Sequence, residues 1–153
     1  MRTSVGLDMI GQLVEGRHEN PSAVLGPHEI EAEGRRALAV RAWLPHVRQA
    51  WVLDHAHAGA MRPMRRIHPA GLFEAICPWD ERRGPARYQL QTANEDGTKA
   101  IMHDPYAFPN ALTDYDLYLL AEGRHWHSYE KLGAHLRTFD GVSGVQFAVW
   151  APN

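Results

Sequence analysis

The sequence contains ten histidines, and two pairs of them have a spacing that could bind a metal. His55 and His57 form one pair, and His125 and His127 form the other. Residues two apart share a face of a β-strand but diverge by roughly 200° on a helix. A zinc site needs a third side chain at a matching position, and none follows either pair. We therefore interpret these histidines as solvated loop residues and predict no metal site.

Nucleophilic and acid–base chemistry finds no support in the other reactive side chains. Cys77 is the single cysteine, which excludes disulfide frameworks and paired-cysteine zinc sites, and beside Pro78 at a strand end it is typical of a buried, inert thiol. No nucleophile elbow or phosphate-binding glycine loop is present. Asp114 and Asp116 open a predicted helix, where the helix dipole explains them. We predict no catalytic residue and no cofactor-binding residue.

Tryptophan offers the one remaining chemistry, which is stacking on the apolar face of a sugar ring. Trp79 lies in a loop among proline, aspartate, glutamate and arginine, whose side chains could bind sugar hydroxyls. The alternative is that Trp79 covers the open end of a β-sandwich. Trp51, within a short strand, is the second candidate. Trp43, Phe73 and Tyr88 lie in strand patterns that favour core positions.

Six segments of strand-like pattern, separated by turn residues, must position these side chains. They are residues 36–44, 49–55, 61–67, 72–76, 87–92 and 99–103. The connections are too short for the helical crossovers that parallel strands require. The pattern predicts a mainly β fold, a small immunoglobulin-like β-sandwich over residues 14–103, preceded by a loose leader over residues 1–13.

After residue 103 the pattern changes to a connector over residues 104–142. It contains two predicted short helices, residues 114–122 with Thr113 as N-cap and residues 126–132, followed by a linker with an Asp140-Gly141 turn. Residues 143–153 alternate like a strand with two apolar faces. We expect this segment to be the first strand of a second, truncated sandwich, because a strand without neighbours invites aggregation.

Composition limits the possible partners. The chain is 44% hydrophobic and 22% charged, with a net charge of -2, so it cannot release many counterions from nucleic acid. No apolar run approaches the roughly 20 residues of a membrane helix. The polar start lacks a secretory signal. These features predict a cytoplasmic protein without nucleic-acid or membrane partners.

Several stretches carry a family resemblance, in order, from about residue 20 onward. They include Arg41-Ala42-Trp43-Leu44-Pro45, Ile67-His68-Pro69-Ala70-Gly71-Leu72-Phe73-Glu74, His103-Asp104-Pro105-Tyr106-Ala107-Phe108-Pro109, Asp116-Leu117-Tyr118-Leu119, Tyr129-Glu130-Lys131-Leu132-Gly133-Ala134-His135 and Gly144-Val145-Gln146-Phe147-Ala148-Val149-Trp150-Ala151-Pro152-Asn153. Together they resemble the bacterial glycogen branching enzymes, or 1,4-α-glucan branching enzymes. The string from Tyr129 to His135 is the most specific of them.

In that family an N-terminal β-sandwich precedes a carbohydrate-binding module of the family 48 type, a catalytic (β/α)8 barrel and a C-terminal β domain. The resemblance implies that residues 143–153 are the first strand of that truncated module. It also implies that the chain is the non-catalytic N-terminal region of a glycosyltransferase that forms α-1,6 branches by transferring α-1,4-glucan chains in glycogen biosynthesis. The barrel's catalytic motifs are absent from the sequence, so whether the chain is itself an enzyme stays open.

The implied partners are α-glucan, as glycogen or linear maltooligosaccharide, and the missing barrel domain. Trp79 and Trp51 are the possible glucan-stacking residues. The loop over residues 55–64 departs from the acidic or glycine turn expected of the family, so no glycan contact is carried over to it. Two alternatives remain: a freestanding α-glucan-binding or regulatory module, which should end after a completed sheet, and a non-functional gene fragment.

Overall fold

The computed structural model describes residues 4–54, 60–78 and 88–151. The chain divides into two compact units, Met1–Ala107 and Phe108–Asn153, which we describe separately. The first unit is a β-sheet with a short helix, and the second is a helix followed by a two-stranded sheet. Within the described ranges, no helix has both the length and the apolar character needed to cross a membrane.

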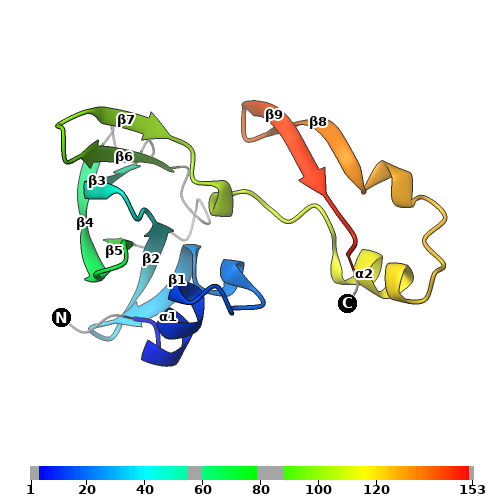
Figure 1. The fold of residues 1–153 in the computed structure, drawn as a ribbon, viewed down its shortest axis with the longest axis horizontal. Coiled ribbons are helices and arrows are strands. Elements are labelled where there is room, and N and C mark those ends of the chain that lie inside the picture. Colours follow the sequence, from blue (N-terminus) through cyan, green and yellow to red (C-terminus); the bar gives the residue numbers. More distant parts are fainter. Residues whose placement is uncertain (1–3, 55–59, 79–87, 152–153) are drawn as a thin grey trace. The chain divides into compact units, whose positions relative to one another are not determined.

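The first unit contains one antiparallel sheet of seven strands in the order β1-β2-β5-β4-β3-β6-β7 (Figure 1). The strands are β1 (Gly26–Ala32), β2 (Arg35–Trp43), β3 (Val47–Asp54), β4 (Ala60–His68), β5 (Leu72–Pro78), β6 (Tyr88–Asn94) and β7 (Lys99–Met102). β4 pairs with β3 through its first residues and with β5 through its last, so it belongs to both halves of the sheet. The predicted mainly β, sandwich-like fold and its six strands are confirmed.

The core lies between the two halves of this sheet. Alternate residues of the central strands point inward, as their period of two requires. The buried cluster is Leu38, Val40, Ala42, Val47, Ala50, Val52, Met64, Phe73, Ala75, Cys77, Tyr88 and Leu90. Phe73 and Tyr88 are core residues as expected, whereas Trp43 packs at the edge of a second cluster on the other face of the sheet.

The first unit contains two elements that the sequence pattern did not indicate, helix α1 (Leu7–Val14) and strand β1. Helix α1 packs Ile10 against Leu25 and Leu72, so residues 7–13 are not the loose leader that we expected. β1 pairs with β2 along its whole length. The two strands are joined by a turn at Glu33 and Gly34, both with positive φ, which matches the twist of a hairpin. The Gly26-Pro27 signal for a turn concealed this edge strand.

Gly71 shows how closely the backbone packs in the first unit. Its φ is 106°, and a Cβ at this position would lie 2.4 Å from the Cα of Pro45. The Gly71 N–H donates to the carbonyl of His68 in the predicted turn, and its carbonyl accepts from the Leu44 N–H. Glycine is therefore required where the β4–β5 turn meets the end of β2.

A buried ion pair between β2 and β5 joins the sheet to the N-terminal segment. Arg41 of β2 and Glu74 of β5 are neighbours in register, and Arg41 Nε lies 3.1 Å from Glu74 Oε1. Ser4 Oγ donates to the same carboxylate oxygen at 2.5 Å, and Arg41 Nη1 donates to the carbonyl of Val24 at 3.2 Å. Burial raises the pKa of Glu74, but the hydrogen bonds from Ser4 and Arg41 outweigh it, so its pKa lies below the usual value.

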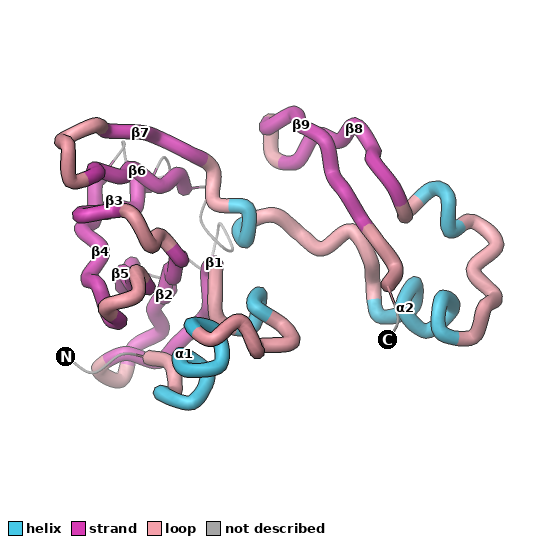
Figure 2. Tube along the Cα trace, viewed as in Figure 1, coloured by secondary structure: helices cyan, strands magenta, loops and turns pink. Residues whose placement is uncertain are grey.

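The second unit begins with helix α2 (Asp114–Ala121), close to its predicted range and capped by Thr113 as predicted. The predicted helix over residues 126–132 is wrong: only a 3-10 turn, Ser128–Glu130, forms there. The predicted linker over residues 135–143 contains most of strand β8 (Gly133–Phe139), which pairs with β9 (Val142–Ala148) around the Asp140-Gly141 turn (Figure 2). Both turn residues have positive φ, which matches the twist of the two strands that the turn joins.

We expect Glu74→Gln to lower the free energy of unfolding of the first unit by about 3 kcal/mol, because the change leaves the buried Arg41 charge without its counter-charge. Urea unfolding at neutral pH measures the effect. Glu29→Gln, at an exposed position of β1, is the matched control and should leave the midpoint unchanged. Equal midpoints for the two variants would show that the Arg41–Glu74 pair contributes nothing to stability.

Candidate functional site

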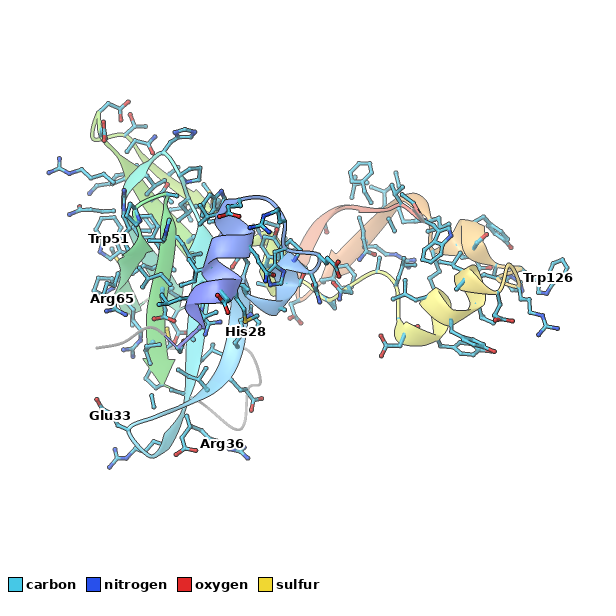
Figure 3. The ribbon with its side chains drawn as sticks, turned by 60° about the horizontal axis from the view of Figure 1, so that its bottom comes forward. His28, Glu33, Arg36, Trp51, Arg65 and Trp126 are labelled. Atoms are coloured by element: carbon cyan, nitrogen blue, oxygen red, sulfur yellow. The ribbon has the colours of Figure 1, made fainter. Side chains whose placement is uncertain are left out.

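The outer face of β4, β3, β6 and β7 carries Trp51 at its centre. Trp51 lies opposite Pro63 of β4 on one side and Gln91 of β6 on the other, and Gln91 lies opposite Ile101 of β7. Trp51 is half-buried, whereas Ile101 is 59% exposed. Trp51 and Arg65 project from the same side of the sheet in Figure 3. The register therefore forms one row across four strands, which we call the Trp51 row.

A second row lies beside it on the same face. Leu53 is opposite Met61 on β4 and Gln89 on β6. The Gln89 side-chain amide lies 3.3 Å from Nε2 of His103, at the end of β7. Two amide side chains of β6, Gln89 and Gln91, thus lie on the same sheet face as the Trp51 indole. Amides offer both donors and acceptors, and an indole offers an apolar plane, so this face has the groups that bind a sugar ring.

The structure places some of the other predicted residues and not others. Trp79 lies outside the described residues, and so do His55 and His57. Cys77 is buried in β5, and burial raises the pKa of its thiol to about 11, which keeps it protonated. In the described ranges, no three His, Cys, Asp or Glu side chains gather as a metal site would require.

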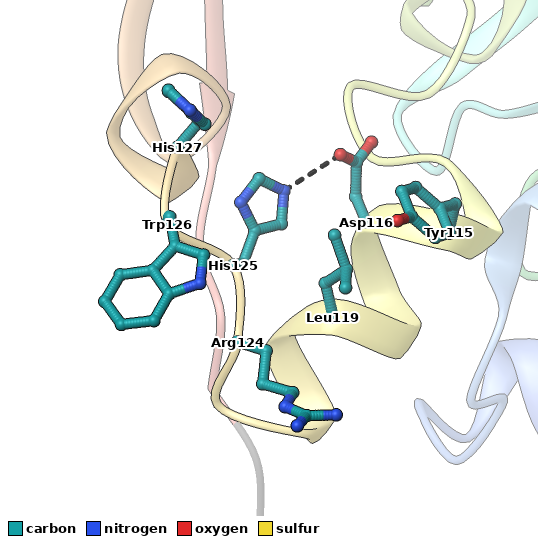
Figure 4. A pocket seen from close by; sticks show the side chains of 7 residues that line it. All are labelled: Tyr115, Asp116, Leu119, Arg124, His125, Trp126 and His127. Atoms are coloured by element: carbon teal, nitrogen blue, oxygen red, sulfur yellow. Dashed lines mark hydrogen bonds and ion pairs between the residues drawn. The ribbon is translucent and has the colours of Figure 1, made fainter.

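The second unit contains a pocket of about 470 Å³ that the sequence pattern did not indicate (Figure 4). Helix α2 and the turn after it supply its lining, which is Tyr115, Asp116, Leu119, Arg124, His125, Trp126 and His127. Its signal in the sequence was a tryptophan between two histidines, shortly after the end of a predicted helix. The interpretation of both histidines as solvated is wrong for His125, whose side chain is buried, whereas that of His127 is exposed.

Asp116 organises the floor of this pocket. Its carboxylate accepts from the backbone N–H of Thr113 at 2.9 Å and from the Thr113 hydroxyl at 2.7 Å, and Nε2 of His125 lies 2.9 Å away. Lys131 Nζ lies 3.3 Å from the same carboxylate. The hydrogen bonds from Thr113, and then that from His125, lower the pKa of Asp116 strongly. A single ionised carboxylate therefore caps α2 and holds the following turn.

The two histidines of the pocket have separate partners. His125 faces Asp116, whereas Nδ1 of His127 lies 3.2 Å from Glu130. Nδ1 of His125 is buried and has no hydrogen-bond partner among the described residues. The side chain of His125 is only 8% exposed, whereas Trp126 beside it is 86% exposed. The pocket thus combines a free aromatic surface with an unsatisfied buried nitrogen.

Comparison with known proteins identifies similar sequences along the whole chain. The family model described as alpha-1,4-glucan branching enzyme GlgB, N-terminal domain, matches residues 7–106. The 1,4-alpha-glucan branching enzyme GlgB of Rhodopirellula baltica is 44% identical over 153 residues, which are 100% of this chain and 20% of that protein. That of Rhodopseudomonas palustris is 49% identical over 141 residues, 92% of this chain and 18% of that protein. The chain therefore spans about a fifth of the length of these relatives.

We expect acid to loosen helix α2 through Asp116. Because its folded pKa is lowered, the carboxylate stabilises the fold fully above its usual pKa of 3.8, and this stabilisation declines as the pH falls below that value. Amide hydrogen exchange of α2, followed by NMR across this pH range, measures the loss. Asp116→Asn should weaken α2 at neutral pH and remove the acid dependence.

The control is Asp114→Asn, which changes an exposed carboxylate in the same helix turn. It should retain the acid dependence of the parent chain. If the acid response survives in Asp116→Asn, another group is responsible for it.

Proposed function

The chain belongs to the GlgB family of alpha-1,4-glucan branching enzymes, and we propose that it is the non-catalytic N-terminal region of such an enzyme. The observation that carries the proposal is the extent of the match. The relatives resemble this chain along its whole length, yet the match covers only about a fifth of theirs. In this proposal, the formation of α-1,6 branches during glycogen synthesis in the cytoplasm belongs to the part of those enzymes outside the match.

The proposed role of the first unit is to bind the α-glucan donor chain and to support the catalytic barrel. The support for glucan binding is the Trp51 row, in which the indole lies opposite Gln91, together with Gln89 in the neighbouring row on the same sheet face. Trp51 is therefore the proposed stacking residue. Trp79 keeps the same proposed role on the strength of its sequence context alone.

We also propose that the β8–β9 hairpin opens a second β-sandwich, a carbohydrate-binding module of the family 48 type. The hairpin leaves large apolar side chains exposed, among them Leu136 of β8, Phe147 of β9 and Val149 directly after β9. A two-stranded sheet is marginally stable without further strands or a packing partner. The support for further strands is thus the exposed apolar surface together with the greater length of the relatives.

A chimera tests the enzymatic context. We expect the Rhodopirellula baltica enzyme to retain branching activity when this chain replaces its matching 153 residues. The measurement is formation of α-1,6 linkages in amylose, followed by proton NMR of the anomeric signals. The same enzyme without those residues is the comparison. A chimera no more active than the deletion would contradict the proposed role.

Affinity electrophoresis in glycogen tests the binding role. We expect glycogen to retard the 153-residue chain, and Trp51→Ala to weaken that retention by about fivefold, since an aromatic contact is worth ~1 kcal/mol. Ile76→Ala, which removes a partly exposed apolar side chain elsewhere on the sheet, is the control. Unchanged retention of Trp51→Ala would exclude the Trp51 row as a glucan site.

A further inference from the structure

We propose that the pocket beside α2 is a second α-glucan subsite, in which one glucosyl residue stacks on Trp126 and bonds through a hydroxyl to His125. This inference rests on the proposed function, because it takes α-glucan as the ligand of the protein. It concerns the second unit and side chains that the Trp51 row does not include. The pocket volume of about 470 Å³ falls within the roughly 300–1,000 Å³ of small-molecule sites.

The aromatic part of the subsite is supplied from two sides. Trp126, from the turn after α2, and Tyr115, from the first turn of α2, lie on opposite sides of the pocket with His125 and Leu119 between them (Figure 4). Trp126 is 86% exposed and Tyr115 is 68% exposed. Their rings therefore add little to the packing of this unit and leave apolar planes open to a ligand.

The polar part of the subsite is the unsatisfied nitrogen of His125. The ionised carboxylate of Asp116 accepts from Nε2 of the ring, which leaves Nδ1 of the neutral ring as an acceptor. A buried nitrogen without a hydrogen-bond partner destabilises the protein, because it has lost its hydrogen bonds to water. A ligand that forms a hydrogen bond to this nitrogen removes that penalty, which favours binding. A sugar hydroxyl can donate to this nitrogen in the neutral ring and can accept from it in the protonated ring, so it satisfies either form.

The remaining charges favour a neutral ligand over an anion. Asp116 already faces His125 and Lys131, so its charge is compensated inside the protein. His127 faces Glu130, which leaves Arg124 as the cation on the pocket rim that can donate to hydroxyl oxygens. A phosphate site gathers several cations or backbone N–H groups around the ligand. Two aromatic rings and one ring nitrogen fit a neutral sugar better.

The test is an NMR titration of the full chain with maltoheptaose, read at the tryptophan indole N–H signals. We expect the Trp126 indole signal to shift on its own saturation curve. Trp126→Ala should weaken that binding about tenfold, the equivalent of ~1.4 kcal/mol, as measured at the His125 ring signals. The exposed position of Trp126 means that this variant should fold like the parent chain.

Two further variants separate stacking from hydrogen bonding. His125→Gln keeps an amide N–H that can reach Asp116 but removes the ring nitrogen, and it should also weaken binding at Trp126. Tyr118→Ala removes an exposed aromatic ring from α2 outside the pocket lining, and it should leave the affinity unchanged. Equal losses in Tyr118→Ala and Trp126→Ala would overturn the assignment to this pocket.

The outcomes separate this inference from the function on which it rests. Shifts confined to the Trp51 indole would overturn the second subsite and leave the proposed glucan binding in place. Shifts at both indoles of the parent chain, with Trp126→Ala weakening the curve measured at His125 and leaving the Trp51 curve unchanged, would support two independent sites. The absence of shifts at either indole, in a chain that glycogen does not retard, would overturn both proposals.

Discussion

The double pairing of β4 is the constraint on which the first unit depends. Its first residues extend the half of the sheet that contains β3, and its last residues extend the half that contains β5. Because one strand serves both halves, the inner face closes around a single core, and Phe73 of β5 packs in the same cluster as Val52 of β3. The outer faces of the two halves are then free to differ.

These outer faces do differ, and the difference separates stability from function. On β2 and β5 the outer face is covered by the N-terminal segment, with Ile10 of α1 against Leu72 and with Ser4 bonded to the Arg41–Glu74 pair. On β3 and β6 the outer face carries Trp51 and amide side chains. A buried ion pair demands complete hydrogen bonding, which the N-terminal segment provides, whereas a ligand surface needs side chains that remain accessible.

The second unit depends on one carboxylate in a similar way. Asp116 completes the cap of α2 and also holds His125 and Lys131, so the segment after the helix is positioned without a large apolar core. The predicted N-cap at Thr113 was correct because capping is a local interaction between residues three apart. The contact of His125 with Asp116 could not be predicted from a local pattern, because the two residues are nine positions apart and a turn separates them.

The sequence by itself determined the β class, the six central strands and the cap of α2, because alternation, turn residues and capping act over a few residues. It also indicated the family, through the resemblance of its motifs. Only the tertiary structure decided that β1 and β8 are strands and that Leu7–Val14 is a helix. Each of these short elements depends on contacts outside its own segment: β1 and β8 pair in hairpins with the adjacent strands β2 and β9, and α1 packs on Leu25 and Leu72. The same reason explains why the Trp51 row and the α2 pocket were not predicted as surfaces, since neighbouring strands and a turn bring their residues together.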